Sequence, residues 1–145
     1  CSAPAFGPVR PCASGVNYGP EPQRGAHKLF YFPGLPGVCM SEFDNMCEQL
    51  VDWRLIGLPY AKLAAESGDH CTMELIAASL ACRVRLLQPE GPYFILGYSL
   101  GALLAVQVAR GLEVEGHAVA ALVLLDPPKI VPRGNDETES GVAKD

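Results

Sequence analysis

A serine at position 99 stands between two glycines in the stretch Gly97-Tyr98-Ser99-Leu100-Gly101. An apolar run, 93–96, precedes this stretch, and a second apolar run begins at Ala102. A strand that turns sharply into a helix holds a serine hydroxyl out of the backbone, where it can act as a nucleophile. The glycines fit this interpretation, because strand and helix pass closest there and leave no room for side chains. The alternative is an ordinary turn with a bystander serine, since G-x-S-x-G alone is a weak motif.

An aspartate follows the last apolar run of the chain. Residues 119–125 are all apolar, Asp126 comes next, and Pro127-Pro128 stop the chain from extending the sheet. The carboxyl ends of strands in an open parallel sheet share one edge, so we expect Ser99 and Asp126 to emerge at the same edge. An aspartate there can orient a histidine that takes the serine proton. The alternative is a turn-forming aspartate that caps the following loop.

An oxyanion hole needs backbone N–H groups aimed at the charge that develops on a carbonyl oxygen. The amide of Leu100, directly after the serine, is the first expected donor. The second is expected in the loop 33–37, whose two prolines have no N–H to give. Gly34, Leu35 and Gly37 remain, with Leu35 preferred by its position. A simple Pro-Gly turn is the alternative.

Strands and helices alternate along the chain, which is typical of an α/β doubly wound fold with a mostly parallel sheet. The expected strands are 28–32, 53–58, 93–97 and 119–125, and the expected helices are 41–50, 72–87 and about 102–114. Ser41 and Thr72 are the expected N-caps, and Gly116 is expected to end the last helix. The unbroken apolarity of 119–125 indicates a central parallel strand that is buried on both faces.

Composition excludes several functions. The 145 residues are 49% hydrophobic, which suffices for one domain with a buried core. A net charge of −5 with eleven scattered basic residues argues against nucleic-acid binding. The six cysteines form no C-x-x-C pair and no zinc-ligand spacing with the histidines, so no metal is expected. Neither a secretory signal nor an apolar stretch of about eighteen residues appears, so we expect a cytoplasmic protein without a membrane partner.

Together these features resemble the thioesterase domain at the end of modular polyketide, nonribosomal peptide and animal fatty acid synthases. The resemblance runs from about 28 to 128, and the lead-in to the serine motif is its most diagnostic part. It rests on Phe32-Pro33-Gly34-Leu35, on Leu87-Gln88-Pro89-Glu90-Gly91-Pro92-Tyr93, on Leu122-Val123-Leu124-Leu125-Asp126, and on the twenty-seven residues from Ser99 to Asp126.

The resemblance implies a partial α/β-hydrolase fold and a defined chemistry. Members of this family accept an acyl chain from the phosphopantetheine thioester of a carrier protein and release it by hydrolysis or cyclisation. For this chain that implies an acyl ester on Ser99. It also implies an acyl or peptidyl carrier domain as partner, expected within the same longer chain. No cofactor of its own is implied, because phosphopantetheine arrives on the substrate.

The family's general base is a histidine well downstream of the acid, and this sequence stops at Asp145. His117 begins the stretch that leads to Asp126, which places it about 30 Å away at the opposite edge. His27 opens the first strand, also at the wrong end. His70 lies in a loop, where a solvated role is favoured over that of a displaced base. We therefore expect the amino-terminal half of a thioesterase domain, with little turnover alone and an unpaired sheet edge.

The expected organisation has three parts. Residues 1–26, with five prolines and four glycines, predict a linker; 27–128 form the thioesterase half-domain; and 129–145 are a polar tail or the start of a lid region. Three other functions stay open. They are a general serine carboxylesterase or lipase, an acyltransferase domain, although these usually carry histidine where this chain has Tyr98, and a noncatalytic thioesterase-like fragment that contacts a carrier domain.

Overall fold

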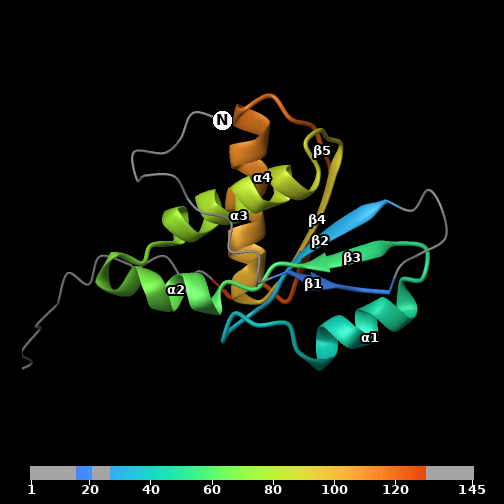
Figure 1. The fold of residues 1–145 in the computed structure, drawn as a ribbon, viewed down its shortest axis with the longest axis horizontal. Coiled ribbons are helices and arrows are strands. Elements are labelled where there is room, and N and C mark those ends of the chain that lie inside the picture. The colour runs from blue at the N-terminus through green and yellow to red at the C-terminus, as the bar shows by residue number, and fades with distance from the viewer. Residues whose placement is uncertain (1–15, 21–26, 130–145) are drawn as a thin grey trace, which may run out of the picture.

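The computed structural model describes residues 16–20 and 27–129 (Figure 1). The predicted tail beyond residue 129 and most of the predicted linker lie outside these ranges. The elements, in chain order, are β1 (Asn17–Tyr18), β2 (Lys28–Phe32), α1 (Ser41–Gln49), β3 (Arg54–Gly57), α2 (Ala61–Ser67), the 3-10 helix η1 (Gly68–His70), α3 (Met73–Leu87), β4 (Tyr93–Tyr98), α4 (Leu100–Val114) and β5 (Val119–Leu125).

The strands form one sheet in the order β1-β3-β2-β4-β5. Strands β3, β2, β4 and β5 are parallel, and β1 pairs with β3 in the antiparallel direction at one edge. Parallel neighbours need crossover connections, and helices supply them here. The four parallel strands therefore end at the same edge of the sheet. This mixed sheet with flanking helices confirms the predicted α/β fold class.

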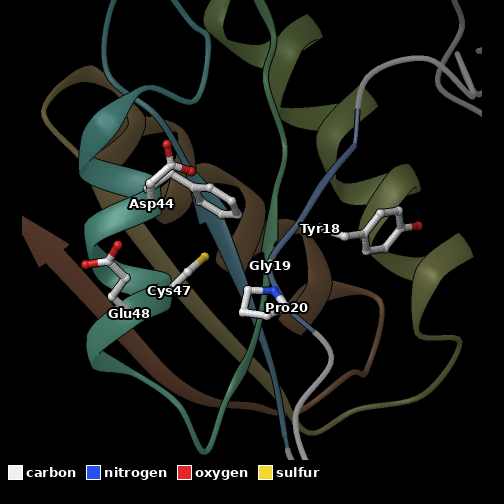
Figure 2. Close-up of a pocket in the computed structure, with 7 residues that line it drawn as sticks. Tyr18, Gly19, Pro20, Asp44, Cys47 and Glu48 are labelled. Carbon is white, nitrogen blue, oxygen red and sulfur yellow. The ribbon is translucent and has the colours of Figure 1, made fainter.

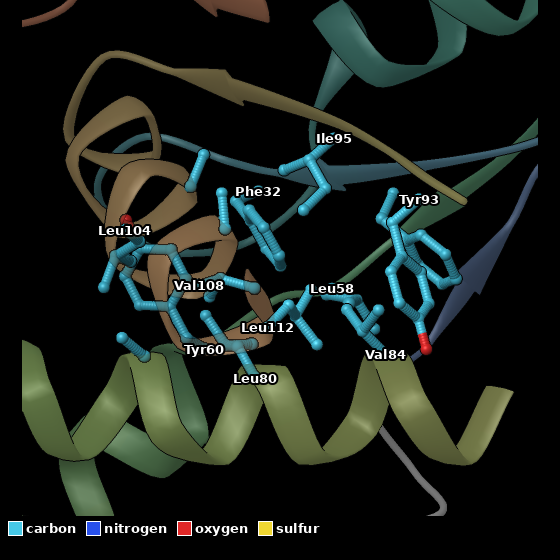
Figure 3. Close-up of a cluster of buried hydrophobic side chains, with 14 of the residues drawn as sticks. Phe32, Leu58, Tyr60, Leu80, Val84, Tyr93, Ile95, Leu104, Val108 and Leu112 are labelled. Carbon is cyan, nitrogen blue, oxygen red and sulfur yellow. The ribbon is translucent and has the colours of Figure 1, made fainter. Parts of the chain in front are cut away.

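Apolar side chains pack on both faces of the sheet. On one face, α3 and α4 cover the central strands, and Leu63 and Ala64 of α2 pack at the margin of the same cluster. Figure 3 shows part of this cluster, which includes Phe32, Leu58, Tyr60, Leu80, Val84, Tyr93, Ile95, Leu104, Val108 and Leu112. On the other face, Phe43 and Cys47 of α1 pack against Leu29, Tyr31, Leu55 and Leu96. The sheet is thus the middle of three layers over part of its width.

Helix α3 has the cap and the buried face that the sequence predicts. The Thr72 hydroxyl oxygen accepts a hydrogen bond from the N–H of Leu75 at 3.1 Å, and Ile76, Leu80 and Val84 are buried. Such a cap satisfies one of the amides that a helix start leaves without a partner.

Within the described residues, no helix is both long enough and apolar enough to cross a membrane.

The prediction that Ser41 caps α1 is wrong. Met40 is the N-cap residue, and Ser41 is already the first residue of the helix. A cap side chain must precede the helix to reach the free amides of its first turn, so Ser41 stands one position too late. The Glu42 carboxylate instead turns back, and its Oε1 accepts a hydrogen bond from the N–H of Met40 at 3.3 Å.

Three elements differ from the expectation, besides the short 3-10 helix η1, which forms where the sequence predicts a loop at His70. Strand β1 lies within the segment interpreted as linker, where Asn17 pairs with Gly57 and Tyr18 with Ile56. Helix α2 has no counterpart among the predicted elements, and none of its residues is fully buried. Helix α4 begins at Leu100, two residues before the expected start.

Strand β5 has the predicted bounds but not the predicted burial. Among the described residues it pairs only with β4, and Leu122, Val123, Leu124 and Leu125 are each about two-fifths exposed. The prediction of a strand buried on both faces is therefore wrong for this part of the chain. Among the residues that the structure describes, the outer side of β5 has no strand partner, which agrees with the apolar, unpaired edge that the sequence predicts.

Candidate active site

The turn at Ser99 connects β4 directly to α4. Ser99 has φ 53° and ψ −120°, a conformation in the left-handed region that L-residues rarely adopt. Such a residue costs on the order of 1–3 kcal/mol and persists only where its surroundings hold it. Both main-chain groups of Ser99 are held: its N–H donates to the Leu125 carbonyl at 2.9 Å, and its carbonyl accepts from Ala102 N–H at 2.9 Å. The predicted tight turn between strand and helix is confirmed.

Two glycines make this turn possible. A Cβ on Gly97 would meet the carbonyl of Gly101 and would lie 2.6 Å from the Cα of Ala102. A Cβ on Gly101 would meet the carbonyl oxygens of Phe32 and Pro33 and would lie 2.7 Å from the carbonyl carbon of Phe32. These are backbone atoms, which cannot move aside as a side chain can. The steric reason for both glycines is therefore confirmed, and Gly101 also brings α4 against the end of β2.

Asp126 stands next to Ser99 at the edge of the sheet. Tyr98 at the end of β4 is paired with Leu125 at the end of β5, so Ser99 and Asp126 are the residues that directly follow two neighbouring strands. Neighbouring strands lie about 4.8 Å apart. Asp126, like Ser99, has a positive φ, of 45°. The two residues therefore share one edge of the sheet, as the strand order predicts.

The loop 33–37 lies against the turn at Ser99. A Cβ built on Gly34 would be 3.0 Å from the Cβ of Ser99 and 3.3 Å from the carbonyl oxygen of Tyr98. The N–H of Gly37 donates to the Gly34 carbonyl at 2.8 Å, which closes a tight turn and removes Gly37 as a free donor. The peptide between Gly34 and Leu35 is planar and trans, so the N–H of Leu35 points away from the carbonyl that closes the turn. Among the described residues, no main-chain acceptor bonds that N–H.

The histidines lie where the topology places them. His27 packs beside Trp53 and Phe94, with ring centroids 5.7 and 5.1 Å away, at the amino-terminal end of the parallel strands. His117 makes an edge contact with Tyr93, the first residue of β4, at 5.8 Å. Ser99 follows the opposite end of that strand, so neither ring is near it. His70 ends the 3-10 helix η1 and is exposed.

A surface cavity of about 430 Å³ lies elsewhere, between β1 and α1 (Figure 2). Its lining residues are Tyr18, Gly19, Pro20, Phe43, Asp44, Cys47 and Glu48. In the sheet order, β3 and β2 separate β1 from β4. The cavity contains none of the residues predicted for catalysis, and the Ser99 site is defined by the sheet edge instead.

Comparison with known proteins identifies the family. The sequence profile of the thioesterase domain family matches residues 27–143. The chain belongs to this family. It is 49% identical over 106 residues to the polyketide synthase PksR of Bacillus subtilis, covering 73% of this chain and 4% of that protein. It is 36% identical over 106 residues to the bikaverin polyketide synthase bik1 of Gibberella fujikuroi, covering 73% of this chain and 5% of that protein.

Solved structures give the same assignment. The thioesterase domain NocB, from the nocardicin cluster, matches with a TM-score of 0.70 and 25% identity, covering 79% of this chain and 51% of that one. The thioesterase domain SrfTE, which cyclises the lipopeptide surfactin, matches with a TM-score of 0.59 and 25% identity, covering 77% of this chain and 43% of that one. The chain is thus similar to thioesterase domains of polyketide and nonribosomal peptide synthases. It spans about half of these thioesterase structures and a small part of the synthases.

One residue beside the site was not predicted from the sequence. Tyr60, just after β3, is 3% exposed, and its hydroxyl donates to the Pro33 carbonyl at 2.8 Å. Burial raises the pKa of this phenol to about 12. The only available signal was its position, since Leu58-Pro59-Tyr60 follows a strand and so reaches the same sheet edge.

Proposed function

We propose that this chain supplies the nucleophile and the oxyanion donors of a serine thioesterase that releases an acyl, polyketide or peptide chain from a carrier protein. Ser99 is the nucleophile, Asp126 orients the general base, and the N–H groups of Leu100 and Leu35 bind the oxyanion. The observation that supports this most is the hydrogen bond from Ser99 N–H to the Leu125 carbonyl. It ties the strained serine turn to β5, the strand that Asp126 directly follows.

The reaction has two halves. The Ser99 hydroxyl attacks the thioester carbonyl and passes its proton to a histidine that lies outside the described residues. The tetrahedral oxyanion is stabilised by the two N–H groups, and it collapses as the C–S bond breaks and the phosphopantetheine thiol leaves with that proton. Water, or a hydroxyl or amine of the chain itself, then attacks the Ser99 ester and regenerates the serine. Phosphopantetheine enters and leaves on the carrier domain, so the chain needs no cofactor of its own.

A cysteine near the same loop is a weaker nucleophile. Cys39 follows the loop 33–37, and burial together with the nearby Glu42 carboxylate raises the pKa of its thiol to about 12. The thiolate is the reactive form of cysteine, and almost none is present at neutral pH with such a pKa. Ser99, at the tip of the turn, is the better placed group for attack.

Two similarities support the carrier-bound substrate. PksR and the bikaverin synthase are polyketide synthases, and this protein chain covers 4 and 5% of them. Such a small share fits a domain that acts on acyl chains assembled by other domains of the same protein. The NocB thioesterase domain has been captured as a covalent complex with a fluorophosphonate nocardicin G analogue, and it is 29% identical to this chain in that structure. A fluorophosphonate is therefore a suitable probe for Ser99.

The test uses the full-length protein that carries this sequence. Initial rates are measured on an acyl thioester of a carrier protein and on the matching oxygen ester, for the wild type, Ser99→Ala and Ser79→Ala. Ser79 is 1% exposed in α3 and its hydroxyl has no partner among the described residues, so Ser79→Ala is a matched control that should keep full rate. Thioester hydrolysis and fluorophosphonate labelling should be lost only in Ser99→Ala.

Two results would contradict the proposal. Thioester hydrolysis that survives in Ser99→Ala at more than about a thousandth of the wild-type rate would remove Ser99 from the mechanism, because losing the nucleophile costs about 10⁶-fold in kcat. A faster wild-type rate on the oxygen ester than on the thioester would support a general carboxylesterase and contradict the proposed thioesterase function.

A further inference from the structure

We propose that Tyr60 is a positioning residue for the oxyanion hole, and that its hydroxyl holds the loop 33–37 against the turn at Ser99. This inference rests on the proposed function, because it concerns the donor at Leu35. Tyr60 itself is not assigned any contact with substrate. It acts through the backbone that carries the Leu35 N–H.

Tyr60 holds both ends of the loop. Its hydroxyl donates to the Pro33 carbonyl at 2.8 Å, and its main-chain N–H donates to the Gly37 carbonyl at 2.8 Å. The next amide, of Ala61, donates to the same Gly37 carbonyl at 3.0 Å. Gly37 has φ +88°, and a Cβ there would lie 2.9 Å from the Tyr60 ring. The loop is therefore packed against the ring as well as bonded to it.

The opposite side of the loop rests on the serine turn. The Pro33 carbonyl lies beside Gly101 in the first turn of α4, and Gly34 lies beside Ser99. The peptide between Pro33 and Gly34 is planar, so the Tyr60 hydroxyl on the Pro33 oxygen also sets the direction of the Gly34 N–H. The following peptide carries the Leu35 N–H. One phenol thus fixes the orientation of the backbone immediately before the proposed donor.

The ring is itself firmly placed. Tyr60 is 3% exposed and belongs to the apolar cluster between the sheet, α3 and α4 (Figure 3). Removing its hydroxyl leaves the ring in place but leaves the Pro33 carbonyl without that partner. Oxyanion donors must lie about 2.7–3.1 Å from the developing charge, and losing one costs 10²–10³-fold in kcat. A misaligned donor should cost part of this, about 10–100-fold.

Tyr93 provides a matched control. Its hydroxyl also donates to a main-chain carbonyl at 2.8 Å, that of Gln88, and the residue is fully buried. Tyr93 begins β4, at the opposite end of the strand from Ser99. Tyr60→Phe and Tyr93→Phe therefore each remove one phenol hydrogen bond of equal length from the same core, and only one of them borders the site.

The experiment compares Tyr60→Phe, Tyr93→Phe and 4-aminophenylalanine at position 60 in the full-length protein, with an acyl thioester substrate. Tyr60→Phe should lower kcat about 10–100-fold with KM within about twofold, because the oxyanion exists only in the transition state. The inhibition constant of a trifluoromethyl ketone, which forms an anionic adduct with the serine, should rise by the same factor. Tyr93→Phe should keep kcat, and the amino group, as a donor, should restore most of it.

Three outcomes would overturn the inference. They are a kcat for Tyr60→Phe within twofold of that for Tyr93→Phe, a fall in kcat without a matching rise in the ketone's inhibition constant, or a Tyr60→Phe protein that does not fold. The last would make Tyr60 a purely structural residue. Failure of the proposed function is seen separately, as thioester hydrolysis and fluorophosphonate labelling that survive in Ser99→Ala.

Discussion

Replacing Gly101 by alanine tests whether the contact between α4 and the end of β2 builds the site. The added Cβ would lie 2.7 Å from the carbonyl carbon of Phe32 and would also meet the carbonyl oxygens of Phe32 and Pro33. Ordinary contacts begin near about 3.5 Å and the two carbonyl oxygens would be closer than the carbonyl carbon, so the backbone must shift by about 1 Å or more. Gly111→Ala is the matched control, because Gly111 lies in the same helix and a Cβ there would have no heavy atom of another element within 4 Å.

The two substitutions should change the stability of the protein in opposite directions. Overpacking costs about 1–3 kcal/mol, and backbone contacts place Gly101→Ala at the upper end of that range. The gain in helix propensity offsets about 1 kcal/mol. Gly101→Ala should therefore lose about 2 kcal/mol of stability, whereas Gly111→Ala should gain about 0.5–1 kcal/mol. The shift also moves the loop that carries Leu35, and misplacement by about 1 Å can cost 10²-fold in rate.

Hydrogen exchange, measured by mass spectrometry on the full-length protein, reports the local change in stability caused by each substitution. Amides of β2 and α4 should exchange about 30-fold faster in Gly101→Ala, because 1.4 kcal/mol corresponds to a factor of ten in the opening equilibrium. Those of Gly111→Ala should exchange no faster than in the wild type. Thioester hydrolysis should fall at least tenfold in Gly101→Ala only. Exchange and turnover in Gly101→Ala that match those of Gly111→Ala would show that the close contact at Gly101 does not build the site.

Two further predictions concern charge. Asp126→Asn should lower kcat on an acyl thioester about 10³–10⁴-fold at neutral pH, because the base loses the carboxylate that orients it. Asp52 lies in an exposed turn, so the control Asp52→Asn should leave kcat unchanged. A loss of less than tenfold in Asp126→Asn would remove Asp126 from the mechanism. Burial raises the pKa of Tyr60 from 10.0 to about 12, so its contribution to stability is complete below pH 10 and is lost as the pH rises towards 12. Local opening measured between pH 9 and 12 should therefore increase more steeply in the wild type than in Tyr60→Phe, and equal slopes would contradict the link to Tyr60.

The elements around Ser99 could be predicted because their signals are local. A run of apolar residues, two glycines and a second apolar run are all within about ten positions, and steric exclusion at Gly97 and Gly101 follows from the turn itself. The shared edge of Ser99 and Asp126 follows from one rule, that parallel strands end together. The structure adds the pairing of Tyr98 with Leu125, which the rule alone does not give.

The features that were not predicted depend on partners that are distant in the sequence. Strand β1 has two residues, and it forms because Asn17 meets Gly57 on β3. Helix α2 has no fully buried residue, so it leaves no strong periodicity to detect. Tyr60 reaches Pro33 across a separation of 27 residues. The predicted burial of β5 was wrong because an unbroken apolar run indicates only that a strand is suited to burial on both faces. Burial also needs neighbouring elements, and among the described residues only β4 pairs with β5.

The mechanism depends above all on Ser99 carrying the acyl chain between the two half-reactions. To test this, the full-length protein is mixed with an acyl thioester and quenched with acid after one turnover time, and any added acyl mass is located by peptide mapping. We expect the acyl group on the peptide that contains Ser99, together with one equivalent of released thiol. An acyl group found on Cys39 instead, or thiol release with an unmodified Ser99 in every quench, would contradict the mechanism.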